Sequence, residues 1–246
     1  MTQRVDRPQI LLLPGNMCDA RLWRGGGGAI VRAIEAQGYL VHDVDFGCDE
    51  TIDAMAARAL SVCDGPLVPI GFSMGGIVAL DMCRQAPARI VALGLIDTTC
   101  HPDTRGQERL RQQQDVRDGR LEQVVTQELK PNYLAHCHAD DAKLLDLLCD
   151  MALQLGPDIF VAQSEALRTR ADLTPMLGQL NMPVFIACGA QDSLCPPALH
   201  RDIAAAIPQA QLHIVNDAGH ILPLEQPIIL ADLLSQFLTS TLGNQT

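Results

Sequence analysis

Ser73 is the residue best suited to chemistry in this sequence, because it stands in a GxSxG pattern between an apolar run and a helical one. Residues 67–70 are short and apolar enough to be a buried strand, and residues 76–83 have the apolar spacing of a helix. A serine at such a sharp turn takes strained backbone angles, and Gly71 and Gly75 lack the Cβ atoms that would collide with the strand and the helix. The pattern predicts a nucleophile elbow, which exposes the hydroxyl at a helix N-terminus where negative charge is favoured.

Two later loops carry the residues that a serine nucleophile needs. Asp192 follows the apolar run of residues 183–189, and His220 follows the run of residues 211–215. Because the carboxyl ends of parallel strands meet at one edge of a sheet, we expect both side chains to lie beside Ser73. A serine hydroxyl is a weak nucleophile, so His220 would take its proton while Asp192 holds the imidazole in one tautomer. Without these two residues, GxSxG is explained equally well by a glycine-rich turn.

Asp97 is an alternative acid for this triad. It ends another apolar run, residues 90–96, and would therefore reach the same edge of the sheet as Asp192. We favour Asp192, and it stays open whether Asp97 shares or replaces its role.

The other histidines and arginines are interpreted as structural or surface residues. His101 and His200 are expected at the surface beside helices. Arg168 and Arg170 could bind a substrate carboxylate, but solvated charges at a helix end are the simpler interpretation. The histidines within residues 136–138 have no carboxylate pair in register with them, so no metal site is expected there.

A strict alternation of strands and helices positions these residues. Apolar runs alternate with helical patterns up to residue 100 and again after residue 180, which is typical of a doubly wound, mainly parallel α/β sheet. The predicted strands are residues 9–13, 39–45, 67–70, 90–96, 183–189 and 211–215. Residues 101–180 instead contain four helical patterns, so we expect a helical cap there and a core domain formed by residues 1–100 and 181–246.

The cap is expected to roof a dry pocket over Ser73. Its helices carry more apolar side chains than a free-standing surface layer would keep, so one face should press on the sheet. These apolar residues are Leu134, Leu144, Leu147, Leu148, Met151, Leu155 and Phe160. Because such a roof would limit acyl length, short acyl chains should be preferred over long ones.

Composition restricts the classes of function. A chain of 246 residues with 48% hydrophobic content can bury one sizeable core. The net charge of −11, without a Lys/Arg cluster, argues against a nucleic-acid or anionic-membrane partner. Nine cysteines without CxxC spacing suggest reduced thiols and a cytoplasmic location, and neither a signal peptide nor a membrane span is expected.

Several spaced motifs together resemble the α/β-hydrolase superfamily. They are PxxLLLPGNMCDARLW from Pro8, GFSMGG from Gly71, a GxxD loop ending at Asp192, and AGHxxPxExP from Ala218. The likeness spans nearly the whole chain, in the chain order serine, acid, histidine. One departure is Pro14, which stands where many relatives have histidine before the glycine.

The resemblance implies an oxyanion hole and a shortened sheet. It assigns the two oxyanion donors to the backbone N–H groups of Asn16 and Met74, and it implies no cofactor. Relatives usually begin with an antiparallel hairpin. Only eight residues precede Gln9, too few for two paired strands, so six parallel strands are predicted, with the bare edge covered by the N-terminal tail or another subunit.

The function implied is that of a cofactor-independent serine hydrolase, similar to carboxylesterases, that acts on a small acyl substrate. Lactonases, carbon–carbon bond hydrolases, perhydrolases and a lyase of menaquinone synthesis resemble the same pattern and stay open. Epoxide hydrolases and haloalkane dehalogenases are disfavoured, because their nucleophile position carries aspartate where this chain has Ser73. The alternative from another class is a non-catalytic ligand receptor that kept the fold. Monomer and homo-oligomer both remain open.

Overall fold

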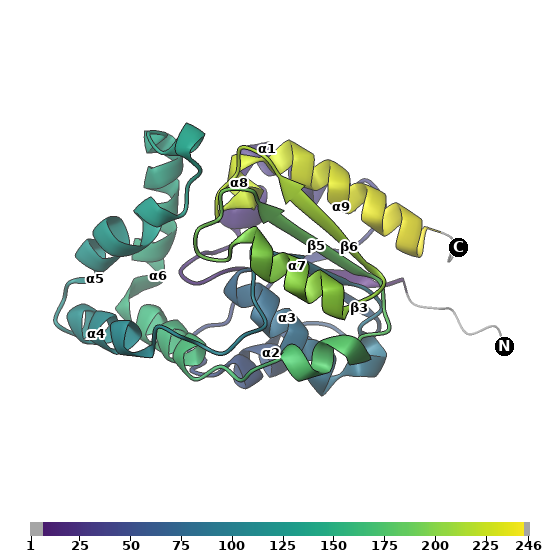
Figure 1. Ribbon diagram of the computed structural model, residues 1–246, viewed down its shortest axis with the longest axis horizontal. Helices are drawn as coiled ribbons and strands as arrows, with labels where there is room; N and C mark the ends of the chain where they lie inside the picture. Colours follow the sequence, from purple (N-terminus) through teal and green to yellow (C-terminus); the bar gives the residue numbers. More distant parts are fainter. Residues whose placement is uncertain (1–6, 244–246) are drawn as a thin grey trace.

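Six parallel strands form one sheet in the order β2-β1-β3-β4-β5-β6. Figure 1 shows this sheet between its covering helices. The computed structural model describes residues 7–243. The strands are β1 (Gln9–Leu13), β2 (Val41–Asp43), β3 (Leu67–Phe72), β4 (Leu93–Ile96), β5 (Val184–Gly189) and β6 (Ala210–Val215). The doubly wound α/β class and the six parallel strands are confirmed.

The chain reverses its course across the sheet between β1 and β3. From β1 it passes to β2 at one edge, returns to the other side of β1 as β3, and continues strand by strand to β6. Leu13 pairs with Gly71 in this register, so the turns that follow β1 and β3 are neighbours. In open α/β sheets, ligands bind in the crevice outside the carboxyl ends of such a strand pair.

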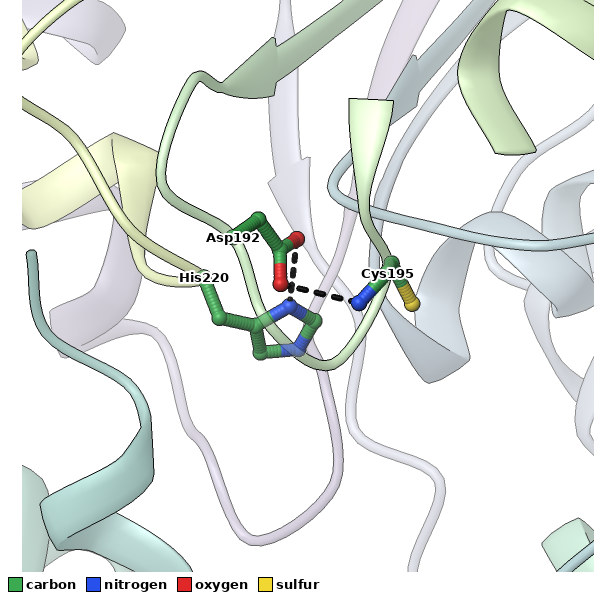
Figure 2. Close-up of side chains that lie close together, drawn as sticks. All are labelled: Asp192, Cys195 and His220. Carbon is green, nitrogen blue, oxygen red and sulfur yellow. Dashed lines mark hydrogen bonds and ion pairs between the residues drawn. The ribbon is translucent and has the colours of Figure 1, made fainter. Parts of the chain in front are cut away.

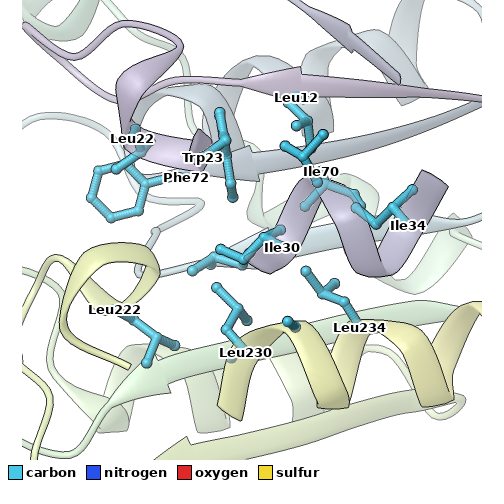
Figure 3. Close-up of a cluster of buried hydrophobic side chains, with 14 of the residues drawn as sticks. Leu12, Leu22, Trp23, Ile30, Ile34, Ile70, Phe72, Leu222, Leu230 and Leu234 are labelled. Carbon is cyan, nitrogen blue, oxygen red and sulfur yellow. The ribbon is translucent and has the colours of Figure 1, made fainter. Parts of the chain in front are cut away.

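Two hydrophobic clusters, one on each face of the sheet, hold the helices. Side chains alternate between faces along a strand, so Ile10 and Leu12 join one cluster while Leu11 and Leu13 join the other. The first face carries α1 (Arg21–Glu35), α8 (Leu222–Glu225) and α9 (Pro227–Leu242), whose packing Figure 3 shows around Trp23. The second face carries α2 (Ile52–Leu60), α3 (Met74–Gln85) and α7 (Pro197–Ala206).

Residues 101–180, all of which the structure describes, form helices and no strand. Residues 106–168 lie to one side of the sheet, in teal and green in Figure 1, whereas residues 174–179 pack beside α7. The helices are α4 (Gly106–Arg117), α5 (Leu121–Gln123), η2 (Val124–Leu129), η3 (Lys130–Asn132), η4 (His136–His138), α6 (Ala142–Arg168) and η5 (Thr174–Gln179). α6 consists of two helical segments that meet at a kink, because the backbone angles of Gly156, φ 84° and ψ 176°, are not helical.

The sheet ends at β2 on one side and at β6 on the other. β2 is only three residues long, and a short edge strand limits pairing with other chains. The predicted cover of this edge by the N-terminal tail concerns residues 1–6, which lie outside the described residues. Among the described helices, none combines the length and the apolar composition that crossing a bilayer requires.

His200 is fully buried, so the expectation that it lies at the surface is wrong. It falls on the apolar face of α7, three residues before Ile203 and seven before Ile207. Its Nε2 accepts a hydrogen bond of 2.9 Å from the backbone N–H of Thr98, and its Nδ1 lies 3.3 Å from the carbonyl oxygen of Pro196. Because its Nε2 accepts a hydrogen bond, the imidazole of His200 is neutral. Burial lowers the pKa of His200 to about 4.

The pH dependence of stability should therefore change in the variant His200→Gln, whose amide oxygen can still accept from Thr98. Between pH 6.5 and pH 4 the unfolded chain binds a proton at His200 that the folded chain does not, so acidification destabilises the wild type. From pH 7.5 to pH 4.5 the wild type should lose about 2–3 kcal/mol more unfolding free energy than the variant. Urea denaturation at both pH values measures the difference, and equal losses would contradict the assignment.

Candidate active site

Ser73 occupies a sharp turn between β3 and α3. Its backbone angles are φ 51° and ψ −114°, in the left-handed region that a non-glycine residue rarely adopts. A Cβ on Gly75 would lie 2.2 Å from the carbonyl oxygen of Leu13, and a Cβ on Gly71 would lie 2.2 Å from that of Gly75. The two glycines therefore let α3 begin directly against the ends of β1 and β3.

Neighbouring backbone and side-chain groups hold this turn in place. The N–H of Ser73 donates to the carbonyl oxygen of Ile96, and the hydroxyl of Thr98 donates to the carbonyl oxygen of Ser73 at 2.6 Å. Since Thr98 also donates its own N–H to His200, a chain of contacts links α7 to the elbow.

The structure brings Ser73, His220 and Asp192 together. The His220 Nε2 lies 3.0 Å from the Ser73 Oγ, and the His220 Nδ1 lies 2.8 Å from an Asp192 carboxylate oxygen. The other Asp192 oxygen accepts the backbone N–H groups of Leu194 and Cys195, both at 2.8 Å. Figure 2 shows the contacts of Asp192 with Cys195 and His220. With Nδ1 donating to the carboxylate, Nε2 is left as the acceptor for the serine hydroxyl.

Aromatic groups enclose the buried imidazole. The ring centroid of His220 lies 5.3 Å from that of Phe72 and 5.1 Å from that of Tyr133. The backbone N–H of His220 donates to the carbonyl oxygen of Tyr133, which joins the histidine loop to residues 101–180.

Asp97 has different partners. One of its carboxylate oxygens accepts the N–H of Gly189 at 2.9 Å, and the other accepts the N–H of Leu222 at 3.1 Å. It is fully buried, and burial, reinforced by the nearby Asp192 carboxylate, raises the pKa of Asp97 well above its ordinary value. Asp97 thus ties the end of β5 to the start of α8, while Asp192 contacts the imidazole.

The loop after β1 is held from both sides by residues 101–180. The N–H of Met17 donates to the side-chain oxygen of Gln163 at 2.8 Å, and its carbonyl oxygen accepts from the ammonium of Lys130 at 3.2 Å. Met17 has a positive φ of 53° and packs in a hydrophobic cluster with Val116 and Phe160. We refer to these contacts as the Met17 clamp.

Two backbone N–H groups near the Met17 clamp, those of Asn16 and Met74, are available as hydrogen-bond donors. Asn16 lies in a turn, and among the described loop and side-chain hydrogen bonds none uses its N–H. Met74 is the first residue of α3, a position whose N–H has no partner within the helix. Both residues line the same cavity as Ser73.

This cavity has a volume of about 360 Å³, and the expectation that seven named apolar residues of residues 101–180 roof it is wrong. Its lining from residues 101–180 includes Asp103, Arg105, Arg109, Gln112 and Arg170. None of the seven apolar residues expected there lines it. Instead they belong to or pack against two hydrophobic clusters, one beneath α1 and α9 and one around Met17.

Arg170 is also placed differently from the solvated helix-end charge expected of it. Its side chain is 10% exposed and contacts Asp103 at 3.0 Å. Arg168, by contrast, pairs with Glu165 at the end of α6 and is about one-third exposed.

Potential ligand atoms of Asp192, Cys195 and His220 lie within 4.8 Å of one another, close enough to surround a cation (Figure 2). Cysteine binds metals as the thiolate. Burial and the carboxylates of Asp192 and Asp97 raise the pKa of the Cys195 thiol well above its ordinary value. Because a neutral thiol is a poor ligand, the arrangement suits proton transfer better than metal binding.

Lys130, Gln163 and Arg109 are not among the site residues expected from the sequence. Gln163 has a detectable signal, since it stands three residues after Phe160 and four before Leu167 on the apolar face of α6. Lys130 and Arg109 have none, because their positions depend on how the helices of residues 101–180 pack against the sheet.

Comparison with known proteins identifies the sequence family. The model of a family described as the alpha/beta hydrolase family matches residues 10–233. A pimeloyl-[acyl-carrier protein] methyl ester esterase from Chromobacterium violaceum is 24% identical over 234 residues, which cover 87% of each chain. A Bacillus subtilis protein assigned as a 2-succinyl-6-hydroxy-2,4-cyclohexadiene-1-carboxylate synthase is 26% identical over 189 residues, 70% of this chain and 65% of that relative.

A solved structure resembles the whole fold. A thermophilic esterase from Thermogutta terrifontis, determined with malate bound, superposes with a TM-score of 0.85 at 25% identity. The match covers 95% of this chain and 90% of that one.

Asp97→Asn and Asp192→Asn should separate stability from activity. In Asp97→Asn an amide NH₂ must face a backbone N–H, so the free energy of unfolding should fall by about 1–3 kcal/mol while hydrolysis is only mildly affected. Asp192→Asn should fold but be badly impaired, because the imidazole loses its carboxylate. Denaturation curves and ester hydrolysis of both variants test this, and the reverse activity ranking would move the acid to Asp97.

Proposed function

The chain belongs to the α/β-hydrolase family and is a hydrolase of ester bonds, and from this premise we propose that it cleaves a small ester through an acyl-enzyme formed on Ser73. His220 is the general base and Asp192 its carboxylate partner. The observation that carries the proposal is the continuous contact from Asp192 through His220 to Ser73, at 2.8 and 3.0 Å, beside a cavity.

The steps follow from the positions of these atoms. As the Ser73 Oγ attacks the substrate carbonyl carbon, its proton passes to the His220 Nε2, and the Asp192 carboxylate stabilises the imidazolium. The C–O bond to the alcohol then breaks, and His220 returns the proton to the leaving oxygen. Water, activated by His220, cleaves the acyl-enzyme and regenerates Ser73.

The oxyanion is assigned to the backbone N–H groups of Asn16 and Met74. Both residues border the cavity beside Ser73, and Met74 begins α3, whose N-terminus favours negative charge. The Met17 clamp fixes the backbone next to Asn16, which supports a donor held in place before substrate binds.

Residues 101–180 are proposed to act as a cap that selects the substrate, while residues 1–100 and 181–246 supply the chemistry. Thirteen of the residues that line the cavity come from this segment, and they include both charged and apolar side chains. Lactones, thioesters and carbon–carbon bonds could be handled by the same three residues. A panel of acyl esters, lactones and thioesters tested on the purified protein separates these subclasses.

Ser73→Ala and His220→Ala should each lower kcat for an activated short-chain ester by on the order of 10³-fold or more, because the two residues act as a unit. A fluorophosphonate probe should label the wild type and not Ser73→Ala. Substantial hydrolysis by Ser73→Ala would contradict the mechanism. Wild-type protein that resists the probe would favour a non-catalytic receptor. Chelators should have no effect on the rate of ester hydrolysis.

Acyl chain length should be limited by the cavity. Short acyl esters are expected to be preferred over long ones, because a cavity of about 360 Å³ accommodates a long acyl chain poorly. Leu129→Ala enlarges the cavity and should shift the ranking of adjacent chain lengths by about 1–3 kcal/mol in kcat/KM per methylene. Leu134→Ala, outside the lining, is the matched control. Activity that rises steadily into long-chain emulsions would contradict a closed pocket.

A further inference from the structure

We propose that Arg109 binds a carboxylate on the substrate, so that the preferred esters are half-esters of dicarboxylic acids. The inference rests on the proposed function, because it names the substrate class of the same cavity. It starts from the charged residues that line this cavity together with Ser73.

Two arginines share one carboxylate at the cavity wall. Arg109 and Arg170 each lie 3.0 Å from the same oxygen of Asp103. The Asp103 side chain is 2% exposed, Arg109 16% and Arg170 10%, so solvent screens this group weakly. Arginine stays protonated in proteins, and the group therefore carries one more positive than negative charge.

The other charged lining residues have partners of their own. Arg105 makes two hydrogen bonds of 2.7 Å to Glu108, and Glu128 contacts Arg111, which also pairs with Asp115. The excess positive charge therefore belongs to the group formed by Asp103, Arg109 and Arg170, although the net charge of the whole protein is −11.

The two arginines differ in how many acceptors they have. Arg170 donates to the Asp103 carboxylate and to the carbonyl oxygens of His101, Pro102 and Leu167, so its role is to hold the loop after β4. Arg109 donates only through Nε, to Asp103. Among the described residues, no hydrogen bond uses either terminal NH₂ group of Arg109.

A carboxylate fits these free donors. The fork of a guanidinium matches the two oxygens of a planar carboxylate, and one negative charge balances the one excess positive charge. Because Arg109 and Ser73 line one cavity, a single substrate can place its ester at the serine and its carboxylate at the arginine.

Matched substrates isolate this contact. Monomethyl esters of succinic, glutaric and adipic acid are compared with the same esters whose second carboxyl is a primary amide, and methanol release is measured. Wild type should prefer the carboxylate form of at least one length. Arg109→Gln should lower kcat/KM for that ester by about 10- to 100-fold, mainly through KM, and leave the amide ester within about twofold.

Arg117→Gln is the matched control, since it removes an exposed arginine from the same helix outside the cavity lining. It should leave the carboxylate preference unchanged. Equal hydrolysis of both forms by wild type, or an equal loss for both forms in Arg109→Gln, would overturn the proposal while leaving the serine mechanism intact.

A binding measurement covers the case in which no ester of the panel is cleaved. Glutarate is titrated calorimetrically into Ser73→Ala and into the double variant Ser73→Ala/Arg109→Gln, after melting curves show that both fold. Binding should weaken at least tenfold in the double variant. Equal affinity, or no glutarate binding to Ser73→Ala, would refute the carboxylate site, whereas binding without any hydrolysis by wild type would refute the proposed function alone.

Discussion

The close approach of α3 to the end of β1 is the constraint on which the rest of the site depends. Gly75 lies so near the carbonyl oxygen of Leu13 that any side chain would force the two elements apart. Their contact makes the turn at Ser73 sharp enough to require a positive φ. It also brings the first N–H of α3 next to the loop after β1, at the point where the sheet reverses its order.

Two buried carboxylates stand behind this turn and are distinguished by their hydrogen bonds. Asp192 accepts two backbone N–H groups on one oxygen and faces the imidazole with the other. Both oxygens of Asp97 accept backbone N–H groups, one from β5 and one from α8. One carboxylate thus orients the histidine ring, and the other orients the loops that carry Asp192 and His220.

The sheet and the meeting of Ser73, Asp192 and His220 could be predicted because local patterns determine them. Continuous apolar runs define the strands, and parallel strands place their following loops at one edge. The cavity lining contributed by residues 101–180, buried His200 and the Met17 clamp could not be predicted, because each depends on packing between distant segments. Arg109 and Lys130 are residue types that usually lie at the surface, and only the fold of residues 101–180 makes them internal.

The Met17 clamp has a mechanical consequence. Gln163 and Lys130 bind the amide and the carbonyl of one residue next to Asn16, and both belong to residues 101–180. Movement of this segment away from the sheet would have to break both hydrogen bonds, which hold the backbone beside the proposed oxyanion donor. Under the proposed function, the placement of residues 101–180 and the positioning of the oxyanion donor are therefore coupled through the backbone of one residue, Met17.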